Sequence, residues 1–185
     1  NWSEAANWNR DTVPNANSNV YFSSTSTKDC TVDQAVSVRN FSLAAGYTGT
    51  VTLSVIIGQN LVVSDTLKLD AGLLVDNGRT VSFKNCYIAN TSTRLTSTGI
   101  WKQTASGEIS NPSVDNVFIL YEVAANLTGT LSGQVYTKQL VLGAGSTVTG
   151  ASYLNLYNPT VDNFIVLGSG AVISPSYLQI TLNSN

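Results

Sequence analysis

Short alternations of apolar and polar residues run along most of the chain, and they predict β-strands rather than helices. Residues 50–52 (Thr-Val-Thr), 80–82 (Thr-Val-Ser) and 147–149 (Thr-Val-Thr) each place one aliphatic side chain between two hydroxyl side chains. A period of two directs the aliphatic residue to one face of a strand and the hydroxyls to the other. Gly, Asn and Asp bound these segments, as is typical of turns. The sequence therefore predicts an all-β protein made of many short strands.

A short apolar motif that ends in glycine recurs along the chain. Its copies lie at 41–46, 67–72, 140–145 and 165–170. The copies begin 26, 73 and 25 residues apart, and the long gap is close to three periods of about 24 residues. Degenerate copies near residues 94–96 and 118–120 would fill that gap. Two further short strands follow each motif, so one period predicts one coil of a β-solenoid.

The period predicts a fold class and a domain organisation. Each coil buries its apolar side chains only by stacking on its neighbours. We predict a single right-handed parallel β-helix of about six to seven coils, a rod on the order of 30 Å long. Residues 1–19 form an N-terminal arm or cap, residues 20–185 form the solenoid, and a longer loop is expected within 84–116. The alternative is a β-sandwich or jelly roll, which also has short, regularly spaced strands.

The first residues of the chain carry a family resemblance. Trp2, the segment Asn7-Trp8-Asn9, Pro14 and the apolar segment 19–22 follow one another in that order. This opening resembles the start of bacterial secreted and surface β-helix repeat proteins of the adhesin type, where an aspartate is usual at the position of Asn19. The resemblance implies a right-handed β-helix in an extracellular setting and brings no catalytic residues with it. We expect Trp2 and Trp8 to cover the first coil.

The composition excludes several kinds of chemistry. The chain has no histidine and only two cysteines, so it has no imidazole base, no histidine-dependent nucleophile and no four-thiolate metal cage. Its net charge of −2 disfavours nucleic acid as a partner. The 11 acidic residues do not align in adjacent coils in the way that a polysaccharide-degrading site requires. We therefore expect no enzymatic activity, no catalytic residues, no metal site and no cofactor.

Other features favour a secreted or surface protein. No apolar stretch reaches the roughly 18 residues needed to span a membrane. The chain begins at Asn1 rather than Met, which suggests a processed or excised segment. Possible glycosylation sites are Asn1, Asn40, Asn90 and Asn126, each followed two residues later by Ser or Thr. Cys30 and Cys86 are about two coils apart, too far for a disulfide within one column, and free thiols are slightly favoured over a bridge.

The final strand predicts assembly. The segment 177–182 is apolar and carries neither charge nor proline, which usually protect an edge strand. The residues expected at this uncovered end are Tyr177, Leu178, Ile180 and Leu182. We expect a structural, self-associating protein, a surface filament or adhesin subunit, that stacks head to tail with copies of itself. The arm could instead pair with a neighbour, or the chain could belong to a longer solenoid.

Two other functions are compatible with the same fold. The first is a carbohydrate-binding or polysaccharide-degrading β-helix. Its sugar-stacking strip would draw on Tyr121, Tyr136, Tyr153, Tyr157 and Tyr177. The second, less favoured, is ice binding by a flat hydroxyl array. The residues of that array would be Thr50, Thr52, Thr80, Ser82, Thr130, Ser132, Thr147 and Thr149.

Overall fold

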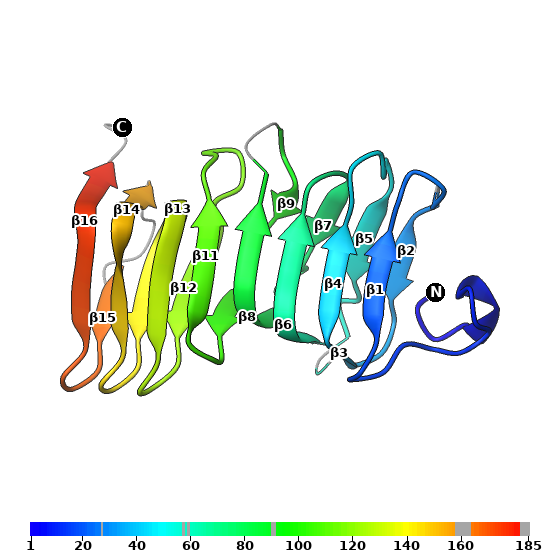
Figure 1. The fold of residues 1–185 in the computed structure, drawn as a ribbon, viewed down its shortest axis with the longest axis horizontal. Helices are drawn as coiled ribbons and strands as arrows, with labels where there is room; N and C mark the ends of the chain where they lie inside the picture. The colour runs from blue at the N-terminus through cyan, green and yellow to red at the C-terminus, as the bar shows by residue number, and fades with distance from the viewer. Residues whose placement is uncertain (27, 57, 59, 90–91, 158–163, 182–185) are drawn as a thin grey trace.

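The chain folds into an elongated stack of parallel strands (Figure 1). The computed structural model describes residues 1–185 except 27, 57, 59, 90–91, 158–163 and 182–185. The described part contains one 3-10 helix, η1 (Ala5–Asn7), and sixteen strands. These are β1 (Asn19–Phe22), β2 (Cys30–Val32), β3 (Val36–Val38), β4 (Asn40–Leu43), β5 (Thr50–Leu53), β6 (Leu61–Leu69), β7 (Leu73–Val75), β8 (Thr80–Ile88), β9 (Leu95–Thr96), β10 (Ile100–Gln103), β11 (Gly107–Asn111), β12 (Phe118–Val123), β13 (Thr128–Leu142), β14 (Thr147–Tyr157), β15 (Ile165–Leu167) and β16 (Val172–Thr181).

The strands form three faces, and every pairing between them is parallel. The front face of Figure 1 is built from β1, β4, β6, β8, β11, β13, β14 and β16. A second face is built from β3, β6, β8, β10, β12, β13 and β15. A short face contains β2, β5, β7 and β9. This is a β-solenoid of about seven coils, which confirms the predicted fold and excludes the sandwich.

Bent strands join the front face to the second face. In β6, residues 61–63 pair on the second face and residues 66–69 pair on the front face, with a shift of register between Val63 and Thr66. β8 and β13 also belong to both faces. A shift of register lets a strand turn a corner without losing its hydrogen bonds. The corner positions therefore set which side chains point outward on the front face.

The core consists of columns of side chains that stack from coil to coil. On the second face, Leu61, Val81, Trp101 and Tyr121 follow one another at intervals of 20 residues. All four are fully buried. Alternation along each strand sends the intervening residues outward, as the sequence predicted. Each coil is stabilised because stacking on its neighbours buries these apolar columns.

The predicted repeat is correct locally and wrong across its long gap. Phe41 pairs with Leu67, and Leu140 pairs with Ile165, as the motif copies predicted. However, Leu67 continues to Cys86 on the front face, whereas Leu140 pairs with Tyr121 on the second face. The two pairs of copies therefore lie on different faces. Coil length varies along the chain, so a constant period could not align them.

The separate sheet of the short face ends at β9, and the third side of the later coils is formed by other segments. Asn111 pairs with Val135, and Phe118 pairs with Thr137. The six residues between Asn111 and Phe118 are thus matched by a single residue in the next coil. A third side nevertheless continues past β9, because Asn116 Oδ1 accepts from the N–H groups of Arg94 and Leu95. Phe118 then pairs with Thr137, Thr137 with Leu156, and Leu156 with Ile180. The described residues of 84–116 show no single long loop, because the end of β8 and the strands β9, β10 and β11 divide the segment.

A buried carboxylate stands at the end of the short face. Asp76 has no exposed surface, and its Oδ2 accepts a hydrogen bond of 2.9 Å from Nε1 of Trp101. Its Oδ1 accepts bonds from the backbone N–H of Gly78 (3.0 Å) and from both the N–H (2.9 Å) and the hydroxyl (3.2 Å) of Thr98. Four donors offset the cost of burying the charge. Asp76 therefore fixes the corner at which the short face gives way to the second face.

Candidate functional site

The N-terminal arm closes the first coil. Trp2 is fully buried, and its backbone N–H donates to the Thr31 carbonyl over 2.8 Å. Nε1 of Trp8 donates to the Trp2 carbonyl over 2.9 Å, and the two indole rings meet edge to face at 4.7 Å. The Trp2 ring also stacks on Phe41 at 6.4 Å. Trp2 and Trp8 therefore lie over the interior of the first coil, where an open end would otherwise expose the core.

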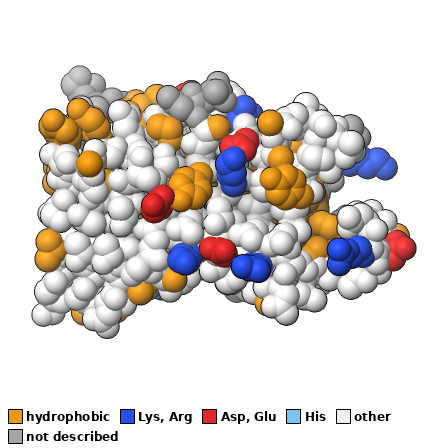
Figure 2. All heavy atoms as spheres, in the orientation of Figure 1, with side chains coloured by type: hydrophobic (Ala, Val, Ile, Leu, Met, Phe, Trp, Pro, Cys, Tyr) orange, Lys and Arg blue, Asp and Glu red, His pale blue; other side chains and the backbone are white. Residues whose placement is uncertain are grey.

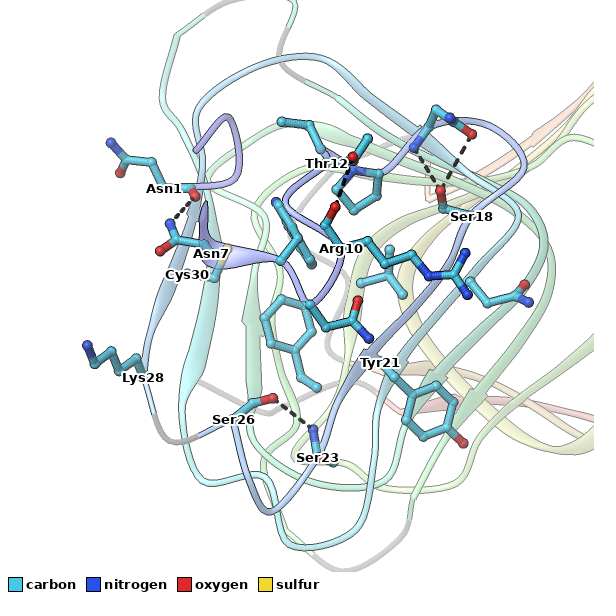
Figure 3. Close-up of a pocket in the computed structure, with 18 of the residues that line it drawn as sticks. Asn1, Asn7, Arg10, Thr12, Ser18, Tyr21, Ser23, Ser26, Lys28 and Cys30 are labelled. Carbon is cyan, nitrogen blue, oxygen red and sulfur yellow. Dashed lines mark hydrogen bonds between the residues drawn. The ribbon is translucent and has the colours of Figure 1, made fainter. Parts of the chain in front are cut away.

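A hollow of about 1270 Å³ lies between the arm and the first coil (Figure 3). Amides and hydroxyls dominate its wall, but many of them bond within the arm itself. Nδ2 of Asn7 donates to the Asn1 carbonyl (2.8 Å), and the hydroxyl of Thr12 donates to the Arg10 carbonyl (3.1 Å). Its polar groups mostly stabilise the arm, and they do not converge on one point as a ligand site requires.

The opposite end leaves apolar side chains exposed. Leu178 and Ile180 pair with Leu154 and Leu156, which are fully buried, so both occupy inward positions. Nevertheless Leu178 is 47% and Ile180 45% exposed. Tyr177 is 56% exposed and stacks on Tyr153, with ring centroids 4.4 Å apart. Of the residues predicted at this end, Leu182 lies outside the described residues.

The last strand is longer than the sequence predicted, and it contains a proline. β16 begins at Val172 and includes Pro175, which pairs with Gly150 next to a shift of register. The interpretation of this edge as free of proline holds only for Tyr177 onward. The regular, uncharged part of the edge strand is therefore Tyr177–Thr181.

The predicted tyrosine strip is wrong in part. Tyr121 is fully buried, and its hydroxyl donates to Oε1 of Gln103 over 2.7 Å. Burial raises its pKa well above the usual range of a phenol. The sequence interpretation also missed Tyr21 and Tyr87, because their common face is visible only from the pairing of strands. Tyr21, Ser42, Lys68 and Tyr87 occupy one row across β1, β4, β6 and β8.

A second, smaller hollow lies in this row. Its volume is about 320 Å³. Its lining residues are Asn19, Tyr21, Asn40, Phe41, Ser42, Thr66 and Lys68. Nζ of Lys68 lies 2.7 Å from Oδ2 of Asp70, and this hydrogen bond and charge raise the pKa of Lys68 above its ordinary value. The hollow thus has an aromatic wall, amide and hydroxyl groups, and a cation whose paired anion, Asp70, is not one of the lining residues.

The two cysteines are free thiols on different faces. Cys30 pairs with Val51 on the short face, and Cys86 pairs with Leu67 on the front face. Burial raises the pKa of Cys30 to about 11 and raises the pKa of Cys86 further. A nucleophilic or metal-binding cysteine requires the thiolate, which these surroundings disfavour. Neither thiol marks a reactive site.

The acidic and hydroxyl residues do not gather into the arrangements considered from the sequence. Within the described part of the chain, no three His, Cys, Asp or Glu side chains lie close enough together to hold a metal ion. Thr50 pairs with Leu73 on the short face, and Thr80 pairs with Ile100 on the second face. Thr130 and Thr149 do pair with each other. The hydroxyl array considered for ice binding is therefore divided among faces.

The glycosylation candidates have different surroundings. Asn1 is exposed, and Asn126 is exposed at a turn with φ 59°. Asn40 is partly buried, and its Nδ2, the atom that would carry a glycan, donates to Oδ1 of Asn19 over 2.8 Å. Asn90 lies outside the described residues. Asn1 and Asn126 are therefore the accessible candidates.

Comparison with known proteins does not assign the chain to a family. No protein-family model, no curated protein and no solved structure matches the chain. Across the described residues, no helix has the length and apolar character to cross a membrane. Any functional proposal therefore depends on the surfaces themselves.

Proposed function

We propose that this β-solenoid is a structural, self-associating extracellular protein, a surface filament or adhesin subunit, that assembles through the coil formed by β15 and β16. The difference between its two ends carries the proposal. Trp2 is fully buried at one end, whereas Leu178 and Ile180 are almost half exposed at the other. Exposed inward positions favour contact with another apolar surface. The protein would act through shape and contact rather than through chemistry.

The occupant we propose for this end is a second copy of the chain. Tyr177–Thr181 has no charged residue, so two such edges meet without repulsion. An edge strand without Lys, Glu or Pro is also free to pair with another strand. Two β16 strands related by a twofold axis would pair antiparallel and give a closed dimer. The exposed side chains of Leu178 and Ile180 would then be covered.

Head-to-tail stacking is a second form of the same assembly. It needs an open N-terminal end, but the arm holds that end through Trp2, Trp8 and the Thr31 carbonyl. A filament would therefore form only after the arm moved or exchanged with that of a neighbour. This favours pairs of C-terminal coils as the first assembly step.

The extracellular setting is supported by two features. The resemblance of the opening residues to adhesin-type β-helices implies such a setting, and the aromatic cluster of Trp2, Trp8 and Phe22 lies at the N-terminal end of the solenoid. The exposed glycosylation candidates Asn1 and Asn126 are compatible with secretion. These observations support the proposed location without depending on the assembly.

Analytical ultracentrifugation with electron microscopy tests the assembly. We expect dimers or larger species at micromolar concentration and above, and monomers for the double variant Leu178→Lys, Ile180→Lys. Val62→Lys is the matched control, because Val62 is 37% exposed on the second face, away from both ends. Rods of twice the monomer length would support pairing of C-terminal coils, and long fibres would support head-to-tail stacking. A wild-type protein that stays monomeric throughout would contradict the proposal.

A further inference from the structure

The front face carries one row of outward residues with a defined order. Tyr21 pairs with Ser42, Ser42 with Lys68, and Lys68 with Tyr87. Tyr21 is 68% exposed, while Ser42 is only 5% exposed. A small residue between two long ones leaves a depression in the sheet surface. Figure 2 shows this face, where separate hydrophobic patches lie on either side of a positive and a negative side chain.

The depression is the hollow of about 320 Å³ described above. Ligand pockets usually span about 300–1,000 Å³, so this hollow suits a small ring rather than a large ligand. Tyr21 supplies one wall and Lys68 the other, with Ser42 between them in register. The hollow is therefore a defined place on an otherwise flat sheet.

Ser42 provides a second, independent observation. Its Oγ is buried, and none of the described residues forms a hydrogen bond with it. A buried hydroxyl without a partner costs free energy, and native structures contain few of them. Ser42 lines the hollow, but its Oγ has no exposed surface, so the side chain must turn toward the hollow before a ligand hydroxyl can supply the missing bond.

The amide groups beside Ser42 are held in place. Nδ2 of Asn40 donates to Oδ1 of Asn19 over 2.8 Å, and Oδ1 of Asn40 accepts from the Thr66 N–H over 3.0 Å. In the described part of the chain, nothing accepts from Nδ2 of Asn19, which leaves that amide available to a ligand. Groups fixed in this way bind without a large entropy cost.

We propose that this hollow binds one ring of a neutral saccharide. A pyranose has an apolar C–H face, which suits an exposed tyrosine ring, and a rim of hydroxyls, which suits amides, Ser42 and the Lys68–Asp70 pair. Because Asp70 neutralises Lys68, the hollow gives no preference to an anion. The net charge of −2 also disfavours nucleic acid. This site is distinct from the proposed assembly surface.

The row of Tyr21, Ser42, Lys68 and Tyr87 favours a linear saccharide that runs along the axis of the solenoid. Adjacent strands lie about 4.8 Å apart, so Tyr87 stands about 14 Å from Tyr21, the reach of a short oligosaccharide. The hydroxyl of Tyr87 donates to Oε2 of Glu108 over 2.8 Å, which restrains the ring. Tyr87 is thus the second contact for a longer chain, beyond the ring held at Ser42.

Titration followed by NMR or calorimetry tests the site. The probes are cellobiose, cellohexaose, maltohexaose and chitohexaose, with hexagalacturonate as the charged comparison. We expect at least one neutral probe to bind, about tenfold more weakly to Tyr21→Ala and about fivefold more weakly to Ser42→Ala. Tyr87→Ala should weaken binding of the hexasaccharide while leaving a disaccharide unchanged.

Two comparisons keep the outcome independent of folding and of assembly. Ser42→Ala removes an unpaired hydroxyl, so its melting temperature should be unchanged or higher while its saccharide binding falls. Tyr153→Ala, an exposed tyrosine outside the hollow, should bind like the wild type. The proposal is overturned if no neutral probe binds, if the charged probe binds best, or if Tyr21→Ala and Ser42→Ala bind as the wild type does. Variants of β16 should bind normally, which separates this test from that of assembly.

Discussion

The first coils and the last coils of this solenoid fill their interiors with different kinds of side chain. Up to β12, fully buried aromatic side chains such as Phe41, Trp101 and Tyr121 fill the interior. After β12, the buried apolar side chains of the described residues are aliphatic, such as Leu131, Leu140 and Leu154. Deleting a large buried ring removes more apolar contact than deleting an aliphatic side chain does. The early coils should therefore depend most on their large buried residues.

Removing the cap should have the largest effect on stability. Trp2→Ala deletes a fully buried indole, and we expect it to lower the free energy of unfolding by about 3–5 kcal/mol. Leu178→Ala, at a half-exposed position of the last coil, should cost about 1 kcal/mol, measured at a concentration without assembly. Denaturant unfolding followed by tryptophan fluorescence checks both variants. Equal losses would contradict the difference between the two regions.

The corner between the short face and the second face depends on Asp76. Asp76→Ala leaves the Trp101 indole N–H and the donors of Thr98 and Gly78 without their acceptor, and we expect a loss of about 3 kcal/mol. Asp76→Asn keeps the size and one acceptor oxygen, so it should cost less. Thermal unfolding with hydrogen exchange of the Thr98 and Gly78 amides measures this. A normal melting temperature for Asp76→Ala would show that the corner does not need the carboxylate.

The attachment of the arm should weaken in acid. Ser3 donates from its hydroxyl (2.6 Å) and from its N–H (3.0 Å) to the carboxylate of Asp33, and the hydroxyl bond is the main cause that lowers the pKa of Asp33. A lowered pKa stabilises the arm above the ordinary carboxyl pKa of about 3.9, and this stabilisation is lost as the pH falls through the pKa in the folded protein.

Hydrogen exchange of the Trp2 amide measures this acid effect, after correction for the intrinsic pH dependence of exchange. Protection should fall as the pH drops below about 4, and Ser3→Ala should remove most of this dependence. The effect should be small, because Asp33 is close to solvent. Protection that is unchanged in acid would show that other contacts alone hold the arm.

The smallest expected effect concerns the two cysteine thiols, which should react slowly in the folded protein. With its pKa raised to about 11, Cys30 should react slowly with iodoacetamide at pH 8 and faster as the pH approaches 11. Cys86, fully buried, should react only after unfolding. Mass spectrometry of folded and denatured samples distinguishes the two sites. Rapid modification of Cys86 in the folded protein would mean that the front face opens.

The sequence predicted the architecture better than the alignment of its coils. The alternation of aliphatic and hydroxyl residues and the paired motifs at Phe41 and Leu67 were sufficient to predict a solenoid. The alignment of Leu67 with Leu140 failed because the spacing changes from 26 residues (Phe41 to Leu67) to 19 residues (Leu67 to Cys86). A repeat search assumes a constant period, whereas the coils of this solenoid differ in length.

The candidate surfaces were predicted only where they lie near one end of the chain. The exposure of Tyr177, Leu178 and Ile180 follows from an apolar strand placed last. The row that contains Tyr21 and Lys68 could not be found in this way. Its members are 47 residues apart, and their common face depends on the register of three strands. Likewise, nothing in the sequence around Tyr121 distinguishes a core tyrosine from a surface one.

One residue, Tyr136, lies between Val135 and Thr137, and this short connection indicates where the protein tolerates insertions. It occupies the place that six residues fill between Asn111 and Phe118 one coil earlier, yet the strands on either side keep their pairing. The third side of the coil therefore tolerates a difference in length at this point, while the front face keeps its register. A peptide inserted between Asn111 and Phe118 should be displayed on the rod without changing the front-face register. The fold is in this sense a scaffold that accepts new loops on one side while presenting a constant surface on the other.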